Sequence, residues 1–133
     1  MKRKTNLQKA KEKAVRFAMD SYVADNPRCE LCGAWASTAH HVIRQSRSNY
    51  LRTEARNLVA ICRSCHYKLH LGNEPIYMGT LIKKRGMKWL DRLQKESRIE
   101  IRDTVGYWED KYKELEMRAL KNWSRLRAVD NSA

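Results

Sequence analysis

All the cysteines and histidines of this 133-residue chain lie in one window between Cys29 and His70. The window covers less than a third of the chain and holds four residues of each kind. Thiols and imidazoles are the side chains that bind transition metals most readily, so their clustering indicates metal binding. Any fold proposed for this chain must therefore arrange the segment around a metal ion.

The cysteines form two C-x-x-C pairs, which predict a structural zinc site. Each C-x-x-C turn presents two sulfurs to one ion, and two turns complete a tetrahedral shell with Zn–S distances of about 2.3 Å. Four thiolates leave no coordination position open for a substrate, so the site is expected to stabilise the fold. A segment of roughly 45 residues is too short to be stabilised by its own apolar core. The expected ligands are Cys29, Cys32, Cys62 and Cys65.

Two other interpretations of the cysteines account for less of the sequence. The run from Cys62 to His66 matches the C-x-x-C-H pattern of haem attachment, but that pattern leaves Cys29 and Cys32 without a role. A thioredoxin-like redox pair requires a βαβ context, which the sequence lacks. Zinc is favoured, because a d¹⁰ ion accepts tetrahedral geometry and has no redox chemistry.

The histidines distinguish this segment from a simple zinc ribbon, which needs only its cysteines. His40 and His41 are neighbours in an expected strand, so their side chains point to opposite faces and serve different purposes. His66 and His70 are four residues apart on an expected helix, so both can reach the same ion. A single histidine is most often a core residue, but four in one unit predict a second site.

At these residues the chain resembles the HNH endonucleases, or His-Me finger nucleases, which are hydrolases with a ββα-metal core. The resemblance covers about residues 28–72 and includes C-x-x-C pairs before the first motif and around the last. The matching segments are Ala39-His40-His41-Val42-Ile43, Arg56-Asn57-Leu58-Val59-Ala60-Ile61-Cys62 and Cys65-His66-Tyr67-Lys68-Leu69-His70. The last pair of histidines resembles the colicin nuclease branch, whereas many zinc-bearing members have lysine in place of His70. A weaker resemblance to phage recombination nucleases of the NinG and Rap type extends into the flanking helices.

The resemblance implies a metal-dependent endonuclease that hydrolyses phosphodiester bonds in DNA, with a structure-selective role in phage recombination. His41 is then expected to be the general base that activates water, and Asn57 to pin the loop across the strands and orient that base. His40, His66 and His70 are expected to bind one catalytic divalent ion, which stabilises the leaving oxygen. Imidazole ligands allow Mg²⁺, Mn²⁺, Ni²⁺ or Zn²⁺, and histidine rather than aspartate at position 40 disfavours strict dependence on Mg²⁺.

The charge of the chain predicts a nucleic acid as its partner. Lys and Arg number 28 against 15 Asp and Glu, which gives a formal net charge of +13. Such residues bind phosphates without reading sequence, so we expect weak sequence specificity or recognition of DNA shape. Trp35 and Tyr50 could stack on an unpaired base, although packing in the core is the more common role of an aromatic side chain. The expected substrate contacts are Arg44, Arg47, Arg52, Arg56 and Lys68.

The expected fold is α+β and mostly helical, with the zinc-stapled ββα core between two helical extensions. Hydrophobic periodicity predicts a first helix, and β-rich runs predict two short strands followed by a metal-binding helix. Two further helices divided at Gly86 and a long last helix should follow Pro75. The first four elements are expected over residues 5–24, 39–43, 58–61 and 63–71. The expected domains are a basic helix in 1–27, the core in 28–73 and a basic helical extension in 74–133.

Several alternatives stay open on the sequence. A non-catalytic zinc-finger module that binds nucleic acid is the main alternative to the DNA nuclease, and a nuclease of RNA is another. The sequence does not distinguish among nicking, double-strand cutting and junction resolution. The long last helix is expected to pack on the body of the protein, with a homodimer through a short coiled coil as the alternative. Charged residues interrupt any apolar core of a signal peptide near the N-terminus. No apolar run reaches the ~20 residues that a membrane span needs. The expected location is therefore the cytoplasm, which for a phage protein is the cytoplasm of the host.

Overall fold

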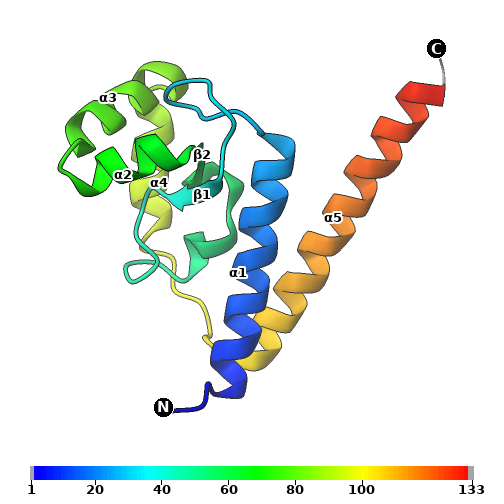
Figure 1. Cartoon of the computed structure of the whole chain (residues 1–133). Coiled ribbons are helices and arrows are strands. Elements are labelled where there is room, and N and C mark those ends of the chain that lie inside the picture. Colours follow the sequence, from blue (N-terminus) through cyan, green and yellow to red (C-terminus); the bar gives the residue numbers. More distant parts are fainter. Residues whose placement is uncertain (1, 132–133) are drawn as a thin grey trace. The chain divides into compact units, whose positions relative to one another are not determined.

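The computed structural model describes residues 2–131, with side chains through Arg125, and contains five α-helices and one small sheet in that range (Figure 1). Met1 and residues 132–133, at the outer ends of the expected terminal segments, lie outside the described residues. The α+β, mostly helical class is confirmed. The helices are α1 (Asn6–Asp25), α2 (Arg63–His70), α3 (Glu74–Arg85), α4 (Met87–Glu96) and α5 (Val105–Asn131).

The sheet has two antiparallel strands, β1 (Thr38–His41) and β2 (Leu58–Ile61). Every residue of β2 is buried, because it is covered on both faces, whereas buried and half-buried residues alternate along β1. The register sets His40 opposite Val59. The alternation in β1 therefore gives its two histidines different surroundings.

Two 3₁₀ turns, Tyr50–Thr53 and Ala55–Asn57, fold the connection between the strands. They carry Leu51 and Asn57 into the interior, and both side chains are fully buried. A single turn is too short to show a hydrophobic period, so the sequence pattern does not reveal it.

Local signals set the ends of several helices. At the start of α1, Thr5 and Gln8 form a capping box, in which each side-chain oxygen accepts the backbone N–H of the other residue, at 3.1 and 2.8 Å. Pro75 occupies the first turn of α3, where backbone N–H groups have no partner within the helix, so proline loses no hydrogen bond there. Gly86 separates α3 from α4 with φ +87°, a conformation that glycine adopts without strain.

The described residues group into two compact units, 19–101 and 2–18 together with 102–131. The first unit contains the sheet, α2, α3 and α4. In the second, the indole of fully buried Trp108 donates a hydrogen bond to Asp103 at 2.7 Å. The division into three domains made from the sequence stays a prediction. None of the described helices combines the length and the apolar character needed to cross a bilayer.

The core of residues 19–101 extends beyond the ββα segment itself. Val59 of β2 packs with Tyr77 and Leu81 of α3, and Leu51 packs with Leu93 of α4. These side chains are almost completely or fully buried. Helices α3 and α4 thus supply apolar surface that the short ββα segment needs in order to exclude water.

Candidate metal centres and nuclease site

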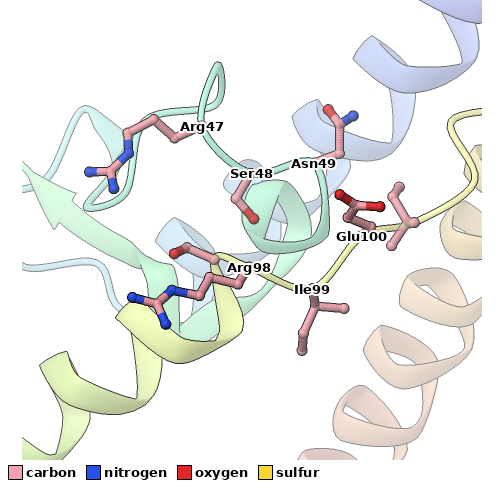
Figure 2. Close-up of a pocket in the computed structure, with 8 residues that line it drawn as sticks. Arg47, Ser48, Asn49, Arg98, Ile99 and Glu100 are labelled. Carbon is pink, nitrogen blue, oxygen red and sulfur yellow. The ribbon is translucent and has the colours of Figure 1, made fainter.

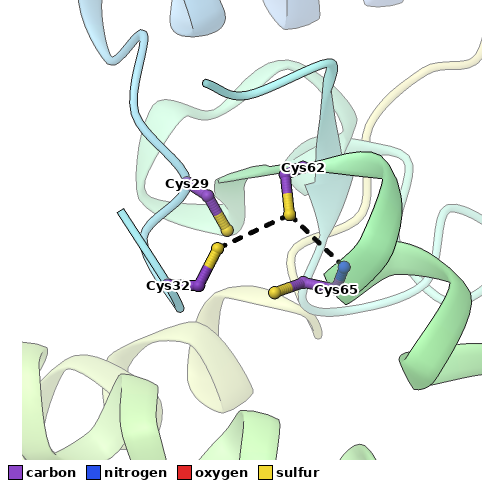
Figure 3. Close-up of side chains that lie close together, drawn as sticks. All are labelled: Cys29, Cys32, Cys62 and Cys65. Carbon is purple, nitrogen blue, oxygen red and sulfur yellow. Dashed lines mark hydrogen bonds between the residues drawn. The ribbon is translucent and has the colours of Figure 1, made fainter. Parts of the chain in front are cut away.

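Four cysteine sulfurs converge where the turn after α1 meets the junction of β2 and α2 (Figure 3). Their ligand atoms all lie within 4.8 Å of one another, and the sulfurs of Cys32 and Cys62 are 3.6 Å apart. A tetrahedral shell with Zn–S distances of about 2.3 Å has sulfur–sulfur edges of about 3.8 Å, so the donor set fits zinc. The four predicted ligands are therefore positioned to bind one metal ion, and their chemistry suggests structural zinc.

The backbone prepares these thiols for metal binding. Cys62 caps the N-terminus of α2, where its sulfur accepts the N–H of Cys65 at 3.4 Å. Burial raises the pKa of Cys29, but backbone hydrogen bonds, the strongest of them from Cys62, outweigh burial and bring the value down to about 7. The thiolate form of Cys29 is therefore accessible near neutral pH, whereas burial and hydrogen bonds with the other three cysteines raise the pKa of Cys65.

Three of the four histidines form a row between β1 and α2. The ring centroid of His40 lies 5.5 Å from that of His66, which lies 4.8 Å from that of His70. The structure thus brings together the three residues predicted to hold the catalytic ion. Among the described residues, only the cysteines have all their ligand atoms within 4.8 Å of one another, so the imidazoles must turn toward a common point to share an ion.

His40 is held in the form that can bind a metal. Burial, together with the positive potential of the neighbouring histidines and Arg44, lowers its pKa from 6.5 to about 4. The ring is therefore neutral at physiological pH and its lone pair is available. Tyr77 of α3 packs against it edge-on, with ring centroids 5.7 Å apart. The sequence analysis missed this contact, because helical periodicity marks Tyr77 only as a core residue.

His41 lies on the opposite face of β1 from His40 and is 7% exposed. Its Nε2 atom is 2.8 Å from the backbone carbonyl oxygen of Arg52. A carbonyl oxygen only accepts hydrogen bonds, so Nε2 carries the proton and Nδ1 is the basic nitrogen. Burial lowers the pKa of His41 below 6.5, although the bond to Arg52 partly opposes this shift. The ring is therefore neutral at pH 7 and can accept a proton at Nδ1.

Asn57 is completely buried and ties together the connection between the strands. Its Oδ1 accepts the N–H of Ile43 at 2.7 Å, and its Nδ2 donates to the carbonyl oxygens of Ile43 and Leu51 at 3.1 and 3.2 Å. Arg52, whose carbonyl holds His41, directly follows Leu51. The amide of Asn57 therefore restrains the peptide segment that orients the imidazole.

The basic residues predicted to contact substrate differ in their surroundings. Arg44, Arg47 and Lys68 are exposed. The guanidinium of Arg52 donates to Gln45 at 3.3 Å. Arg44, Arg47 and Lys68 therefore present their charge to solvent beside β1 and α2.

Arg56 makes its interactions within the fold. Its guanidinium forms ion pairs with Glu54, at 3.0 Å, and with Glu96, and it donates to the hydroxyl of Tyr50 at 3.1 Å. Burial lowers the pKa of Arg56, but its contacts with the two carboxylates and Tyr50 raise it overall. Its charge is compensated inside the protein, so less of it is available to a phosphate.

An open hollow of about 490 Å³ adjoins Arg47, between the loop after β1 and the segment after α4. Figure 2 shows the side chains of Arg47 and Arg98 extending to the same side of it, with Glu100 elsewhere on the rim. Two guanidinium groups on one side suit a phosphate, which the carboxylate would repel. The sequence analysis missed Arg98, because no motif surrounds it.

Residues 28–71 match the family model described as HNH endonuclease. No curated protein and no solved structure matches the chain. The matched range contains the whole cysteine cluster and all four histidines, so the family comparison and the geometry point to the same segment. The chain therefore contains a segment, residues 28–71, that matches the HNH endonuclease family and carries a four-cysteine cluster consistent with a structural zinc site.

Proposed function

We propose that this protein is a metal-dependent endonuclease that hydrolyses phosphodiester bonds in DNA. The observation that carries the proposal is the different placement of the two histidines of β1. His40 joins the histidine row, whereas His41 is kept neutral by burial and is oriented by the Arg52 carbonyl. The match to the HNH family supports a nuclease as the class of enzyme. A module that only binds nucleic acid would need the cysteine cluster but no oriented base.

The proposed chemistry at His41 is general base catalysis. Nδ1 of His41 takes a proton from a water molecule, while the Nε2–H bond to the Arg52 carbonyl disperses the positive charge that the ring gains. The water oxygen forms a bond to phosphorus, and the bond from phosphorus to the leaving oxygen breaks. Asn57 keeps the ring in place, because it restrains the segment that ends at that carbonyl.

The residues proposed to hold the catalytic ion are His40, His66 and His70. A divalent cation bound there would act as a Lewis acid that stabilises the negative charge of the leaving oxygen. Three imidazole ligands suit Zn²⁺ or Ni²⁺ better than Mg²⁺. The base and the ligands do not compete, because His41 lies on the other face of the strand.

The proposed substrate contacts are the exposed basic residues Arg44, Arg47 and Lys68, with Arg98 at the hollow of Figure 2. They would bind phosphates independently of sequence. The resemblance to NinG and Rap nucleases extends the proposal to branched DNA in phage recombination. Thiols kept reduced for zinc suit the cytoplasm.

The test is cleavage of several nucleic acids by the zinc-loaded, full-length protein. Supercoiled plasmid, a branched junction, single-stranded DNA and RNA are each incubated with Mg²⁺, Mn²⁺, Ni²⁺ or Zn²⁺, with EDTA as the control. We expect DNA to be cut by the wild type and not by His41→Ala. If both proteins bind DNA equally and neither cuts any substrate, the protein is a binding module, and faster cutting of RNA would make it an RNA nuclease.

A further inference from the structure

The turn between α1 and β1, which carries Cys29 and Cys32, presents a large aromatic side chain to solvent. Trp35 is 66% exposed, which is unusual for tryptophan. The guanidinium of Arg28 lies over one face of its ring, 3.7 Å from the ring centroid. No carboxylate among the described side chains forms an ion pair with Arg28. The pair thus combines an exposed aromatic surface with an uncompensated positive charge.

The backbone holds this pair on a rigid support. Arg28 and Trp35 form an isolated antiparallel bridge, and the N–H of Cys29 donates to the carbonyl of Ala34 at 2.6 Å. The same turn carries two of the cysteines of the zinc cluster. A side chain on such a support loses little conformational freedom when it binds a ligand, so its contacts contribute more of their energy to affinity.

We propose that Arg28 and Trp35 form a binding site for an unpaired nucleotide. The base stacks on the indole of Trp35, and the guanidinium of Arg28 contacts a neighbouring phosphate. Aromatic stacking combined with a cationic group is how proteins bind single strands without reading sequence, because every base has a π face. The net charge of +13 favours this ligand over a protein partner.

The position of Trp35 in the chain connects this site with the proposed nuclease centre. His40 lies five positions after Trp35, so their α-carbons are at most roughly 18 Å apart. A stacked strand advances about 3.4 Å per nucleotide, so this span corresponds to at most about five nucleotides. The inference rests on the proposed function and names its substrate class, which is DNA with an unpaired segment beside the cleaved bond.

The experiment measures binding of the full-length, zinc-loaded protein to labelled DNA by fluorescence anisotropy. The probes are a single-stranded oligonucleotide and the blunt duplex of the same sequence, with no divalent ion added so that neither is cut. The variants are Trp35→Ala, Trp35→Phe and Arg28→Gln. Trp123→Ala is the matched control, because Trp123 is also exposed, at 56%, but belongs to α5. Zinc content and circular dichroism verify that each variant is folded.

We expect Trp35→Ala to weaken single-strand binding by about 5- to 150-fold while duplex binding changes by less than about twofold. Trp35→Phe should keep most of the affinity, and Trp123→Ala should match the wild type. Arg28→Gln should reduce the slope of log affinity against log salt by roughly 0.7 on the single strand, the value for one phosphate contact.

Two results would overturn the proposal. One is single-strand affinity of Trp35→Ala within about twofold of the wild type, well below the loss expected from stacking. That result would favour a protein as the partner that binds the exposed tryptophan. The other is an equal loss on both probes, which would show no preference for unpaired bases. Because the assay needs no cleavage, a protein that binds as expected but cuts nothing contradicts only the proposed function.

Discussion

Arg85 of α3 and Glu30, in the turn that carries Cys29 and Cys32, form an ion pair, with Nη2 of Arg85 2.7 Å from Oε1 of Glu30. The same Nη2 donates to the hydroxyl of Tyr22 and the carbonyl of Leu58, each at 2.9 Å. The other carboxylate oxygen of Glu30 accepts the N–H of Ala60 at 2.6 Å. Helix α3 lies outside residues 28–71, so this pair joins the matched domain to the chain that follows it.

Replacement of Arg85 by methionine should destabilise the fold by about 1–3 kcal/mol, because the half-buried carboxylate of Glu30 loses a charged partner. Urea unfolding followed by circular dichroism measures the change. Arg92→Met is the control, since Arg92 is mostly exposed in its pair with Glu96 and should contribute less than about 0.5 kcal/mol. Equal stability of the two variants would contradict a structural role for the Arg85 pair.

Loss of a zinc ligand should unfold the core. Structural zinc in small thiolate sites contributes about 10–16 kcal/mol, which is comparable with the whole stability of a domain. We therefore expect Cys29→Ala to lose its cooperative thermal transition and its bound zinc, measured by calorimetry and atomic absorption. His41→Ala should retain both. A native-like transition in Cys29→Ala, together with no zinc in the purified wild type, would refute the four-sulfur site.

Removal of the proposed base should impair cleavage without affecting binding. His41→Ala should cut DNA about 10²- to 10⁴-fold more slowly, the usual cost of losing general base catalysis. Its zinc content and DNA affinity should equal those of the wild type, because His41 belongs to neither metal site. Asn57→Ala should be slowed less, since the base is misoriented but present. It should also unfold at lower urea, because it loses three buried hydrogen bonds.

His66→Ala should differ from His41→Ala in its dependence on metal. His66 lies in the middle of the histidine row, so its loss should raise the metal concentration needed for half-maximal activity. Activity is measured against the concentration of Mn²⁺ or Ni²⁺, and excess metal should partly restore it. For His41→Ala the same titration should give the wild-type midpoint with a low plateau. Identical metal dependence of the wild type and His66→Ala would exclude His66 as a ligand.

The pH profile of cleavage should report on His41. A general base works when deprotonated, and burial lowers the pKa of His41 below 6.5. Activity should therefore rise with pH with a midpoint below 6.5, the pKa of an unperturbed histidine, and level off above that pH. The measurement is kcat at saturating metal from acidic to neutral pH. A rate that still rises well above pH 7 would be incompatible with a base of lowered pKa.

Much of the local structure could be predicted because its signals lie close together in the sequence. The strand over 58–61 has the predicted bounds, and the division of the helices at Gly86 is confirmed. Glycine adopts positive φ at little cost and therefore often marks the end of a helix, as Gly86 does here. The two 3₁₀ turns before β2 were not predicted, because one turn has no periodicity.

The sequence by itself determined the two sulfur pairs of the cysteine cluster, since C-x-x-C spacing already brings two sulfurs to one point. The meeting of the two pairs, 30 residues apart, depends on the tertiary structure. Only the tertiary structure decided which nitrogen of His41 is basic, because that depends on a carbonyl 11 residues away. It also decided that Arg56 is paired with Glu96, 40 residues along the chain, while Trp35 is open to solvent. Spacing within one turn is set by backbone geometry, whereas the choice among many charged and aromatic partners is made only when distant segments pack.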